Sequence, residues 1–480
     1  MLGTQKYGLC LVLLMMCCGV VLSQEDLDES LPPDTAQRVP ADAMFLIGDI
    51  VISGNKKTKA PVILREIPFK TGEHYPLSTL VKKFEDARRQ LMNTTLFHSV
   101  IVAARDFDGN RVNVTVHVRE RWYLFPFPYF KPVDRNLNQW LVEQKASLSR
   151  VNYGAKLLYN NPTGYNDKLR LYLIGGYTKQ ISLSYDRLYF DRSMKWGGTL
   201  SFNTGKNREI NYNTMNDKQV FLKDNNSYLR NFLNITGELS YRRAIKTRHS
   251  FGIGYYRERV SDTVVALNGD YFKEGKNSIA FPEIFYKMTY YDLDYIPYPT
   301  KGYAAFVSVS KKGFNQTVNV WQIDAKGLAS WKLSPKTFLN LNVYGGLKLP
   351  FDQPYFNRRF LGYSDVFLQG FEYFVVDGVA GGYTKATLAR EILNFKIRIP
   401  PVKKGKDPEY IPFRVFAKMY GNAGYVHSPS PGENQLNNQM LWSGGFGIDI
   451  LTLYDVTFKL EWSFNHLGQN GLFLHRKSIF

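Results

Sequence analysis

The residue types used in hydrolysis and metal catalysis are present in this chain, but their spacing does not fit those reactions. The sequence contains no Gly-x-Ser-x-Gly, no His-Glu-x-x-His and no cluster of cysteine and histidine, the arrangements that serve acyl transfer, zinc-dependent proteolysis and metal binding. His427 and His466 fall near the ends of expected strands, where a solvated residue is far more common than a catalytic one. We therefore expect no enzymatic activity, no cofactor and no metal site.

An unusual loop indicates packing or binding instead of catalysis. The stretch SDVFLQGFEYFVVDG, from Ser364 to Gly378, lies between two strand-like runs and places many aromatic residues around one glycine. Loops that run through water are normally polar, because their backbone groups must be solvated. The composition of this loop raises the question of what covers it.

The N-terminus and the charge indicate the compartment. MLGTQKYGLCLVLLMMCCGVVLSQ has one lysine and a short apolar run, the layout of a secretory signal peptide, so residues 1–23 are expected to be removed and residues 24–43 to form a linker. The mature chain would then form no disulfide, because the three cysteines are Cys10, Cys17 and Cys18. The net charge of +19 favours anionic partners such as lipid head groups. No nucleic-acid motif accompanies it.

Residues 44–121 are expected to form a small α+β domain. Phe45 to Ile52 reads as a strand, APVILREI as a short helix and Pro76 to Met92 as a longer helix with one apolar face. FHSVIVAARDF and RVNVTVHVRE follow as a hairpin with an Asp-Gly turn. The order β-α-α-β-β predicts a three-stranded sheet covered on one face by two helices.

Residues 122–480 are expected to be entirely β. In GFGIDILTLYDVTFKLEWSF, Phe446 and Ile448 project to one face, whereas Gly447 and Asp449 project to the other. Such alternation fits a soluble sandwich or a membrane barrel. Strand-like runs of ten residues or more and 15% aromatic residues favour the barrel, since they suit an oblique crossing of a bilayer with aromatic girdles. The turn signals predict a mainly β fold, with an antiparallel transmembrane β-barrel of about sixteen strands in a bacterial outer membrane.

Several local patterns then occur in the order typical of one known family. IVISGNKKT, ILREIPFKTGEHY and RRQLMNTTLFHSVIV are together similar to a POTRA domain. DLDYIPYPTKGYAAFVSVS is similar to a mid-barrel hairpin, and GFGIDI and EWSFNHLGQNGLFLHRKSIF to closing strands. The chain resembles the BamA/TamA superfamily of outer-membrane assembly and translocation proteins, also called the bacterial surface antigen family, with a single POTRA domain.

The resemblance implies a place for the aromatic loop. In the family, the loop after the eleventh strand folds into the lumen and carries an Arg-Gly-aromatic motif that contacts the inner wall. Here the lumen-loop motif is Leu368, Gln369, Gly370 and Phe371, and glutamine replaces the arginine, so its bonds to a wall carboxylate would be neutral and weaker. The expected wall partner is Asp449, unless that carboxylate meets water or a lumen lysine. Arg358 and Arg359 are substitute anchors, and Phe480 resembles the terminal aromatic residue of a barrel-targeting signal.

The resemblance also implies a function. We expect a non-enzymatic insertase or translocase, whose POTRA domain, in the periplasm, receives unfolded outer-membrane or secreted polypeptides and whose first and last barrel strands part. Anionic outer-membrane lipids are expected partners, as are accessory periplasmic proteins or lipoproteins. A passive channel and a dedicated two-partner-type secretion translocator remain alternatives, although the linker is short and broken for the plug helix that such translocators carry.

Overall fold

The computed structural model describes residues 43–132, 151–191, 193–315, 317–363, 366–399 and 409–475, together with Lys145 and Leu148. The expected signal peptide, nearly all of the expected linker and Phe480 lie outside these residues. The chain divides into two units, Met1–Ala43 and Met44–Phe480, and the description below concerns the second unit.

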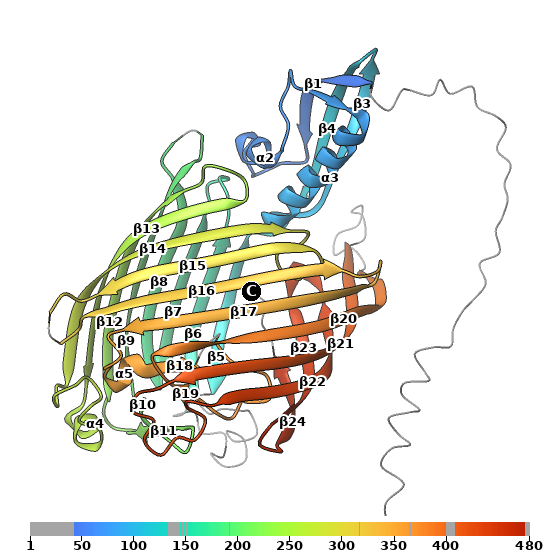
Figure 1. The fold of residues 1–480 in the computed structure, drawn as a ribbon. Coiled ribbons are helices and arrows are strands. Elements are labelled where there is room, and N and C mark those ends of the chain that lie inside the picture. Colours follow the sequence, from blue (N-terminus) through green and yellow to red (C-terminus); the bar gives the residue numbers. More distant parts are fainter. Residues whose placement is uncertain are drawn as a thin grey trace, which may run out of the picture. The chain divides into compact units, whose positions relative to one another are not determined.

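The first part of this unit is an α+β domain. Its elements are β1 (Met44–Ser53), α2 (Ala60–Glu66), β2 (His74–Pro76), α3 (Leu77–Asn93), β3 (Phe97–Asp108) and β4 (Arg111–Glu120) (Figure 1). Helix α3 buries Leu80, Ala87 and Leu91, and strand β4 buries its alternate valines, which are at most 1% exposed. The 3.6-residue period of the helix and the two-residue period of the strand therefore meet in one core.

The sheet of this domain has one strand more than expected. Its order is β2-β1-β4-β3, whereas the sequence predicts three strands. The additional strand, β2, pairs antiparallel with the start of β1 from Met44 to Leu46. Periodicity does not reveal a strand of three residues, and it forms because the start of β1 has an edge that would otherwise lack backbone partners.

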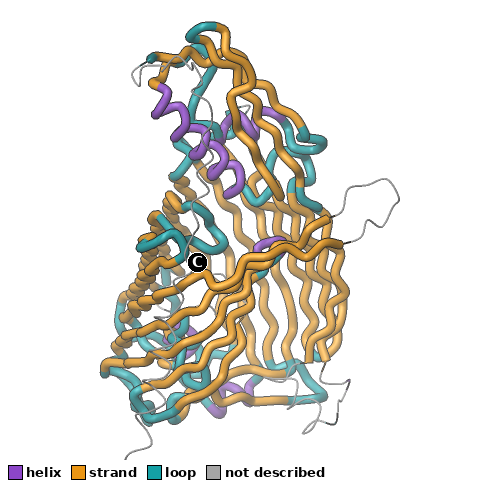
Figure 2. The backbone as a smooth tube through the Cα atoms, turned by 90° about the vertical axis from the view of Figure 1, so that its right-hand side faces the viewer, coloured by secondary structure: helices purple, strands orange, loops and turns teal. Residues whose placement is uncertain are grey.

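The rest of the unit forms a sixteen-stranded antiparallel sheet, as expected (Figures 1 and 2). Each strand of this sheet pairs with the strands that precede and follow it along the chain, except that short strands within the loops pair with each other in two small separate sheets. The strands are β5 (Leu124–Pro132), β6 (Val151–Asn160), β7 (Lys168–Gly176), β8 (Thr178–Tyr189), β9 (Trp196–Asn207), β12 (Arg230–Tyr241), β13 (Thr247–Val260), β14 (Ser278–Leu293), β15 (Gly302–Lys312), β16 (Val320–Lys332), β17 (Thr337–Leu349), β20 (Ala380–Ile399), β21 (Glu409–His427), β22 (Met440–Leu451), β23 (Thr457–Asn465) and β24 (Asn470–His475).

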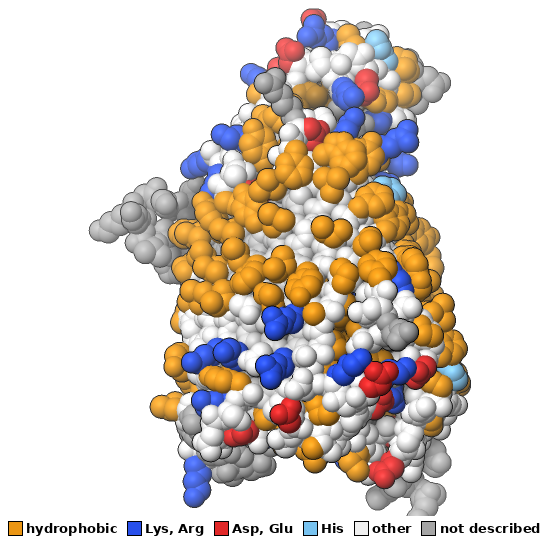
Figure 3. Space-filling view, turned by 90° about the vertical axis from the view of Figure 1, so that its left-hand side faces the viewer, with side chains coloured by type: hydrophobic (Ala, Val, Ile, Leu, Met, Phe, Trp, Pro, Cys, Tyr) orange, Lys and Arg blue, Asp and Glu red, His pale blue; other side chains and the backbone are white. Residues whose placement is uncertain are grey.

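Alternation along the strands separates an apolar outer face from an inner face. In β13, Phe251 and Ile253 are 54% and 68% exposed, whereas the intervening Gly252 is buried. Figure 3 shows apolar side chains gathered in a broad band over the barrel, with lysine and arginine near one border. An apolar band with a charged border is what a lipid-facing barrel surface requires. Among the described residues, no helix has the length and hydropathy needed to cross a membrane.

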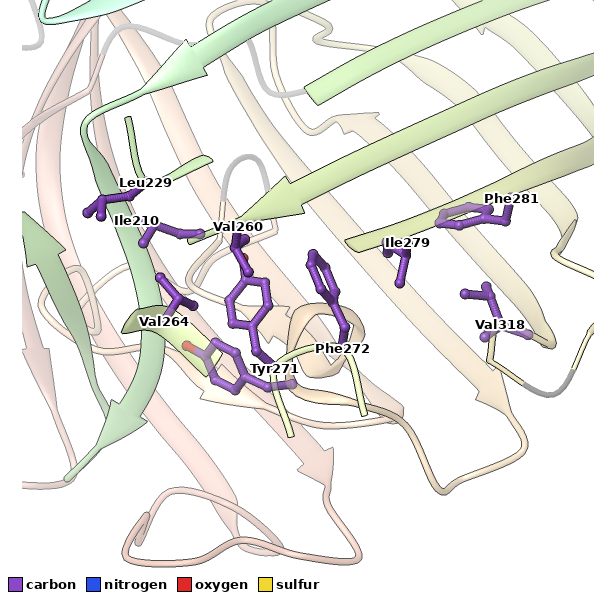
Figure 4. Packing of buried hydrophobic residues seen from close by; sticks show 11 residues of the cluster. Ile210, Leu229, Val260, Val264, Tyr271, Phe272, Ile279, Phe281 and Val318 are labelled. Carbon is purple, nitrogen blue, oxygen red and sulfur yellow. The ribbon is translucent and has the colours of Figure 1, made fainter. Parts of the chain in front are cut away.

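The connections between strands differ at the two rims of the barrel. We call the rim at which β5 begins the N-terminal rim, and the opposite one the loop rim. The loop rim carries β10 (Glu209–Met215), β11 (Lys218–Lys223), α4 (Asp262–Leu267), α5 (Tyr355–Arg358), β18 (Arg359–Leu361) and β19 (Val376–Asp377), and the N-terminal rim carries the turn η3 (Leu453–Asp455). Buried residues from several of these loops, such as Ile210, Val264 and Phe272, form one apolar cluster (Figure 4). The long loops therefore pack on one another at this rim.

Candidate functional site

The aromatic loop of the sequence packs against the inner wall of the barrel. It belongs to residues 350–379, which connect β17 to β20 and are called the inner loop here. Leu368 and Phe371 are 1% and 3% exposed and share an apolar cluster with Val426 and Leu441 of the wall. A Cβ atom at Gly424 on β21 would lie 2.6 Å from Leu368 Cδ1. The wall thus lacks a side chain where the loop inserts one, and burial of apolar area explains the composition of the loop.

Backbone geometry at Gly370 brings the loop close to the wall. Its φ of +88° is a left-handed conformation that glycine adopts without a steric penalty. A Cβ there would lie 3.0 Å from the carbonyl oxygen of Phe464 and from Ser443 Cβ. The Gly370 carbonyl accepts a hydrogen bond from Asn465 Nδ2 at 2.7 Å, and its N–H donates to Glu372 Oε2 at 2.8 Å. Both polar groups of this peptide segment are therefore satisfied at the contact.

Gln369 binds a carboxylate of the wall, and that carboxylate is Glu461. Its Nε2 donates to Glu461 Oε1 at 3.0 Å. Glu461 lies on β23 and also faces His475 Nε2 at 3.3 Å from Oε2. Hydrogen bonds to an ionised carboxylate are stronger than bonds between neutral groups. Gln369 is therefore a neutral donor at a position next to a carboxylate, where a cation would also fit.

The cation beneath the loop is supplied by the wall. Lys418 Nζ lies 2.5 Å from both Asp449 Oδ1 and Glu461 Oε1, and the three side chains are at most 3% exposed. In the strand register, Gly447 stands between Lys418 and Glu461. Because glycine has no side chain, the lysine and the glutamate meet across the middle strand. A lysine of the wall, and not a residue of the loop, thus supplies the positive charge next to Glu461.

These positions correct the expected anchoring of the loop. Asp449 faces inward as expected, but it does not pair with Gln369, since it binds Lys418 and accepts a hydrogen bond from Tyr298 at 3.0 Å. The alternative of a lumen lysine is the one observed. Arg358 pairs with Asp270, and Arg359 donates to the Asn211 carbonyl at 3.1 Å. Both arginines stabilise loops at the loop rim and do not replace the motif arginine.

The first and last strands of the sheet each have one edge without a strand partner among the described residues, and we call these two edges the seam. Within the described residues, β5 pairs only with β6, and β24 only with β23. The carbonyl of Tyr123, just before β5, accepts the Asn160 N–H at 2.8 Å, so odd-numbered residues of β5 point their backbone groups toward β6. Even-numbered residues point toward the seam, and three of them are Pro126, Pro128 and Pro132.

Prolines weaken the β5 side of this seam. Proline has no N–H, so three donor positions on the outer edge of β5 are missing. The outward carbonyl of Leu124 also accepts a hydrogen bond from the Trp122 indole. On the opposite edge, alternation turns the backbone groups of Leu472 and Leu474 of β24 outward. The two edges are therefore poorly matched for a continuous ladder.

The α+β domain has an edge of its own, at β3. The segment Ser99 to Ala104 keeps a regular register with β4 and is bounded by an irregularity at each end. Ile101, in its middle, is 58% exposed. Such an edge can pair with an extended polypeptide through main-chain hydrogen bonds.

Ion pairs connect this domain to residues at the N-terminal rim. Glu66, which is 2% exposed, accepts a hydrogen bond from Arg242 Nη2 at 2.8 Å, and Arg242 Nη1 also contacts it. Arg121 Nη1 donates to Asp455 Oδ2 at 2.7 Å. Both guanidinium groups are bidentate, which fixes geometry as well as charge.

Sequence reasoning missed Lys418, Glu461 and Gly424 at the inner-loop site. The alternation in EWSF places Glu461 on the same face as Asp449, but neighbouring positions across strands follow only from register. The described residues include no group of three or more histidine, cysteine or acidic residues placed to hold a metal ion. The arrangement is suited to holding a loop and exposing strand edges, which is a binding role.

Three comparisons agree with this architecture. The family model described as POTRA, Surface antigen variable number repeat, matches residues 45–121. Outer membrane protein assembly factor BamA from Neorickettsia risticii is 33% identical over 88 residues, which are 18% of this chain. That match spans only 11% of the length of the relative.

Among solved structures, CdiB from Escherichia coli has a TM-score of 0.51 at 11% identity, covering 90% of this chain and 74% of that chain. BamA from Haemophilus ducreyi lacking POTRA domains 1–3 has a TM-score of 0.47 at 14% identity, covering 90% and 83%. The resemblance drawn from the sequence motifs is confirmed, and the fold is that of an outer-membrane β-barrel with a POTRA domain.

Proposed function

From a POTRA domain followed by a sixteen-stranded barrel, the domain architecture of the BamA/TamA superfamily, we propose that this protein inserts polypeptides into a bacterial outer membrane or translocates them across it. Its POTRA domain lies in the periplasm and the N-terminal rim faces the same compartment. The work requires no covalent chemistry, because strand edges and lateral opening suffice to accept an extended chain.

The seam between β5 and β24 carries this proposal. A barrel is stable in lipid because every backbone polar group is paired, yet here one edge of the seam lacks donors at Pro126 and Pro128. Opening the seam therefore breaks fewer hydrogen bonds than opening any fully paired neighbour would. The adjacent strands β22 and β23, by contrast, pair over nine positions.

The POTRA edge is the proposed first contact with the client. The two edge strands of the POTRA sheet are β2 and β3. Because β2 is only three residues long, β3 is the longer edge available for strand addition. Single photo-cross-linkers at positions 99–104 are expected to capture unfolded clients. Capture confined to positions inside the barrel would contradict this assignment.

Locking the seam tests the function. Residues 24–480 contain no cysteine, so Pro126→Cys with Leu472→Cys introduces the only thiols of the mature chain, which thiol-reactive linkers of increasing length can join. A short link is expected to block client assembly or export, with recovery when a cleavable linker is cut. The matched control is a link between Ile448→Cys and Leu460→Cys, which are register partners on β22 and β23. Equal activity in both locked proteins would refute the proposal.

The inner-loop motif from Leu368 to Phe371 is proposed to brace the wall strands beside the seam, with Lys418 and Glu461 as its anchors. His475 of β24 contacts both Glu372 of the loop and Glu461 of the wall, each at 3.3 Å. This contact supports a connection between loop position and the last strand. Loss of the connection is expected to alter seam opening without removing the barrel from the membrane.

A dedicated exporter for one product and a passive channel are the other candidates. Depletion of the protein followed by quantification of the outer-membrane proteome separates them. A broad fall in barrel proteins supports a general insertase, whereas loss of a single product supports an exporter. Altered solute uptake with an unchanged proteome would support the channel. Co-purification from the depleted and normal strains identifies any accessory lipoprotein or periplasmic partner.

A further inference from the structure

The strands β20 and β21 extend far beyond their neighbours at the N-terminal rim (Figures 1 and 2). They have 20 and 19 residues. Pairing of β20 with β17 ends at Arg390, and pairing of β21 with β22 ends at Arg414. Beyond these points the two strands pair only with each other, up to Ile399 and Glu409. We call residues 393–399 and their partners 409–415 the rim ribbon, whose base, Arg414 and Val415, also pairs with β22.

The rim ribbon has one apolar and one polar face. Alternation and register place six apolar residues on one face, namely Leu393, Phe395, Ile397, Ile411, Phe413 and Val415. Leu393, Phe395 and Ile397 are 55%, 44% and 48% exposed. The rings of Phe395 and Phe413 stack with centroids 5.4 Å apart, as expected of register partners on one face. The other face carries Asn394, Lys396 and Arg398 of β20 and their register partners Arg414, Pro412 and Tyr410 of β21.

A bulge aligns this apolar face with the lipid-facing surface of the barrel. In the part of β20 and β21 that belongs to the barrel wall, the outward residues of β20 are even-numbered, as the exposed Leu388 shows. Those of β21 are odd-numbered, as the exposed Met419 shows. An irregularity between Glu391 and Leu393 inserts one extra residue into β20. Without it, Lys396 and Arg398 would face outward in place of Phe395. With it, the apolar residues of the ribbon face the same side as Leu388 and Met419, and the exposed Arg390 lies on that side between Leu388 and the ribbon.

The length and charge of the ribbon indicate where it lies. A tilted strand crosses the hydrocarbon layer with about 9–11 residues, so strands of this length reach the head groups and pass beyond them. Lys396 and Arg398 form no salt bridge within the described residues, whereas Arg414 at the base of the ribbon pairs with Glu391. Basic side chains beside apolar ones at this depth extend toward anionic head groups.

We propose that the rim ribbon is a lipid-binding element that rests its apolar face at the boundary between the acyl chains and the head groups of the periplasmic leaflet and directs Lys396 and Arg398 to anionic phospholipid head groups. Alignment with the lipid-facing wall favours lipid over a protein partner, since a partner that added a strand would need the ribbon edges and not one apolar face. The assignment of the leaflet rests on the periplasmic orientation proposed above. Lipid contact itself does not depend on the handling of clients.

Fluorescence quenching by lipid tests the face. Phe395→Cys and Lys396→Cys, adjacent residues on opposite faces, are labelled with bimane in the full-length mature protein and reconstituted into vesicles with brominated acyl chains. We expect loss of fluorescence at position 395 and little loss at 396. Met419→Cys, on the barrel exterior, is the control for lipid contact, and Ile101→Cys in the POTRA domain is the control for water. Phe413→Cys repeats the measurement if loss of the Phe395 ring disturbs the stack.

A second experiment tests whether Lys396 and Arg398 bind anionic head groups. Quenching at position 395 is expected to increase when phosphatidylglycerol replaces part of the phosphatidylcholine, and that increase is expected to disappear with Lys396→Gln and Arg398→Gln. Absence of quenching at 395 and 413, or equal quenching at 395 and 396, would overturn the lipid-binding proposal. An unchanged response to phosphatidylglycerol would overturn the assignment to anionic head groups. Cross-linking of position 395 to a second copy or to an added polypeptide would assign the face to a protein partner.

Discussion

Replacing Lys418 with methionine is expected to destabilise the barrel strongly. The substitution keeps the length and apolar stem of the side chain but removes the ammonium group that lies 2.5 Å from Asp449 and from Glu461. Both carboxylates then remain in a wall where their side chains are 2% and 1% exposed. The remaining partners are the Tyr298 hydroxyl, which donates to Asp449, the Gln369 amide, which donates to Glu461, and His475 Nε2 at 3.3 Å from Glu461. The hydroxyl and the amide carry no charge.

The expected loss follows from the burial of the pair. Removing one partner of a buried ion pair costs about 3–5 kcal/mol, because the other charge stays buried without compensation. The two neutral donors keep part of the compensation, which places the expected value near the lower limit, at about 3 kcal/mol. Lys332→Met is the matched control, since Lys332 is exposed at the end of β16 and such a surface change stays within about 0.5 kcal/mol.

Urea unfolding of the folded barrel in detergent, followed by tryptophan fluorescence and by heat-modifiability on gels, measures the difference. The double variant Lys418→Met/Glu461→Gln is expected to recover part of the loss, because only one unpaired carboxylate then remains. A double-mutant cycle gives the coupling between the two residues. An unfolding midpoint for Lys418→Met equal to that of Lys332→Met would refute the buried network as a source of stability.

Three further changes test other parts of the structure. Gly370→Val forces a β-branched residue into a left-handed conformation against the wall and should lower the free energy of unfolding by at least about 2 kcal/mol. This loss should exceed that of Gln369→Ala in the same unfolding assay. Equal losses would contradict the close contact. Pro126→Val with Pro128→Val restores two backbone N–H donors at the seam, each contributing about 0.5–1.5 kcal/mol if paired. The double variant should slow client transit and protect the seam amides in hydrogen exchange. Unchanged exchange would show that the prolines do not limit pairing. Burial raises the pKa of Glu66, but Arg242 and Arg65 lower it by more, so the net pKa lies below its ordinary value. The contribution of Glu66 to stability is therefore complete at neutral pH and is lost as the pH falls through that lowered pKa. Glu66→Gln should abolish this acid sensitivity in thermal unfolding.

Much of the fold could be predicted from the sequence because its signals are local. Alternation with a period of two follows from the geometry of a single strand, so the barrel, its approximate strand number and the inward direction of Asp449 all follow from the residues alone. The aromatic residues from Ser364 to Gly378 likewise predicted that their loop would be covered. The residue pattern, however, gave no indication of β2, whose three residues are too few for a periodic signal.

Tertiary structure alone decided which inward residues meet. Alternation assigns a residue to a face, but the neighbour across a strand depends on register, and register depends on every turn and bulge between the paired segments. Lys418 reaches Glu461 because Gly447 falls between them in the ladder, and Gln369 therefore binds Glu461 and not Asp449. In the rim ribbon, one inserted residue determines whether Phe395 or Lys396 faces the lipid. A one-residue shift in a structure of period two exchanges its faces, and only the pairing of β20 with β21 establishes that shift.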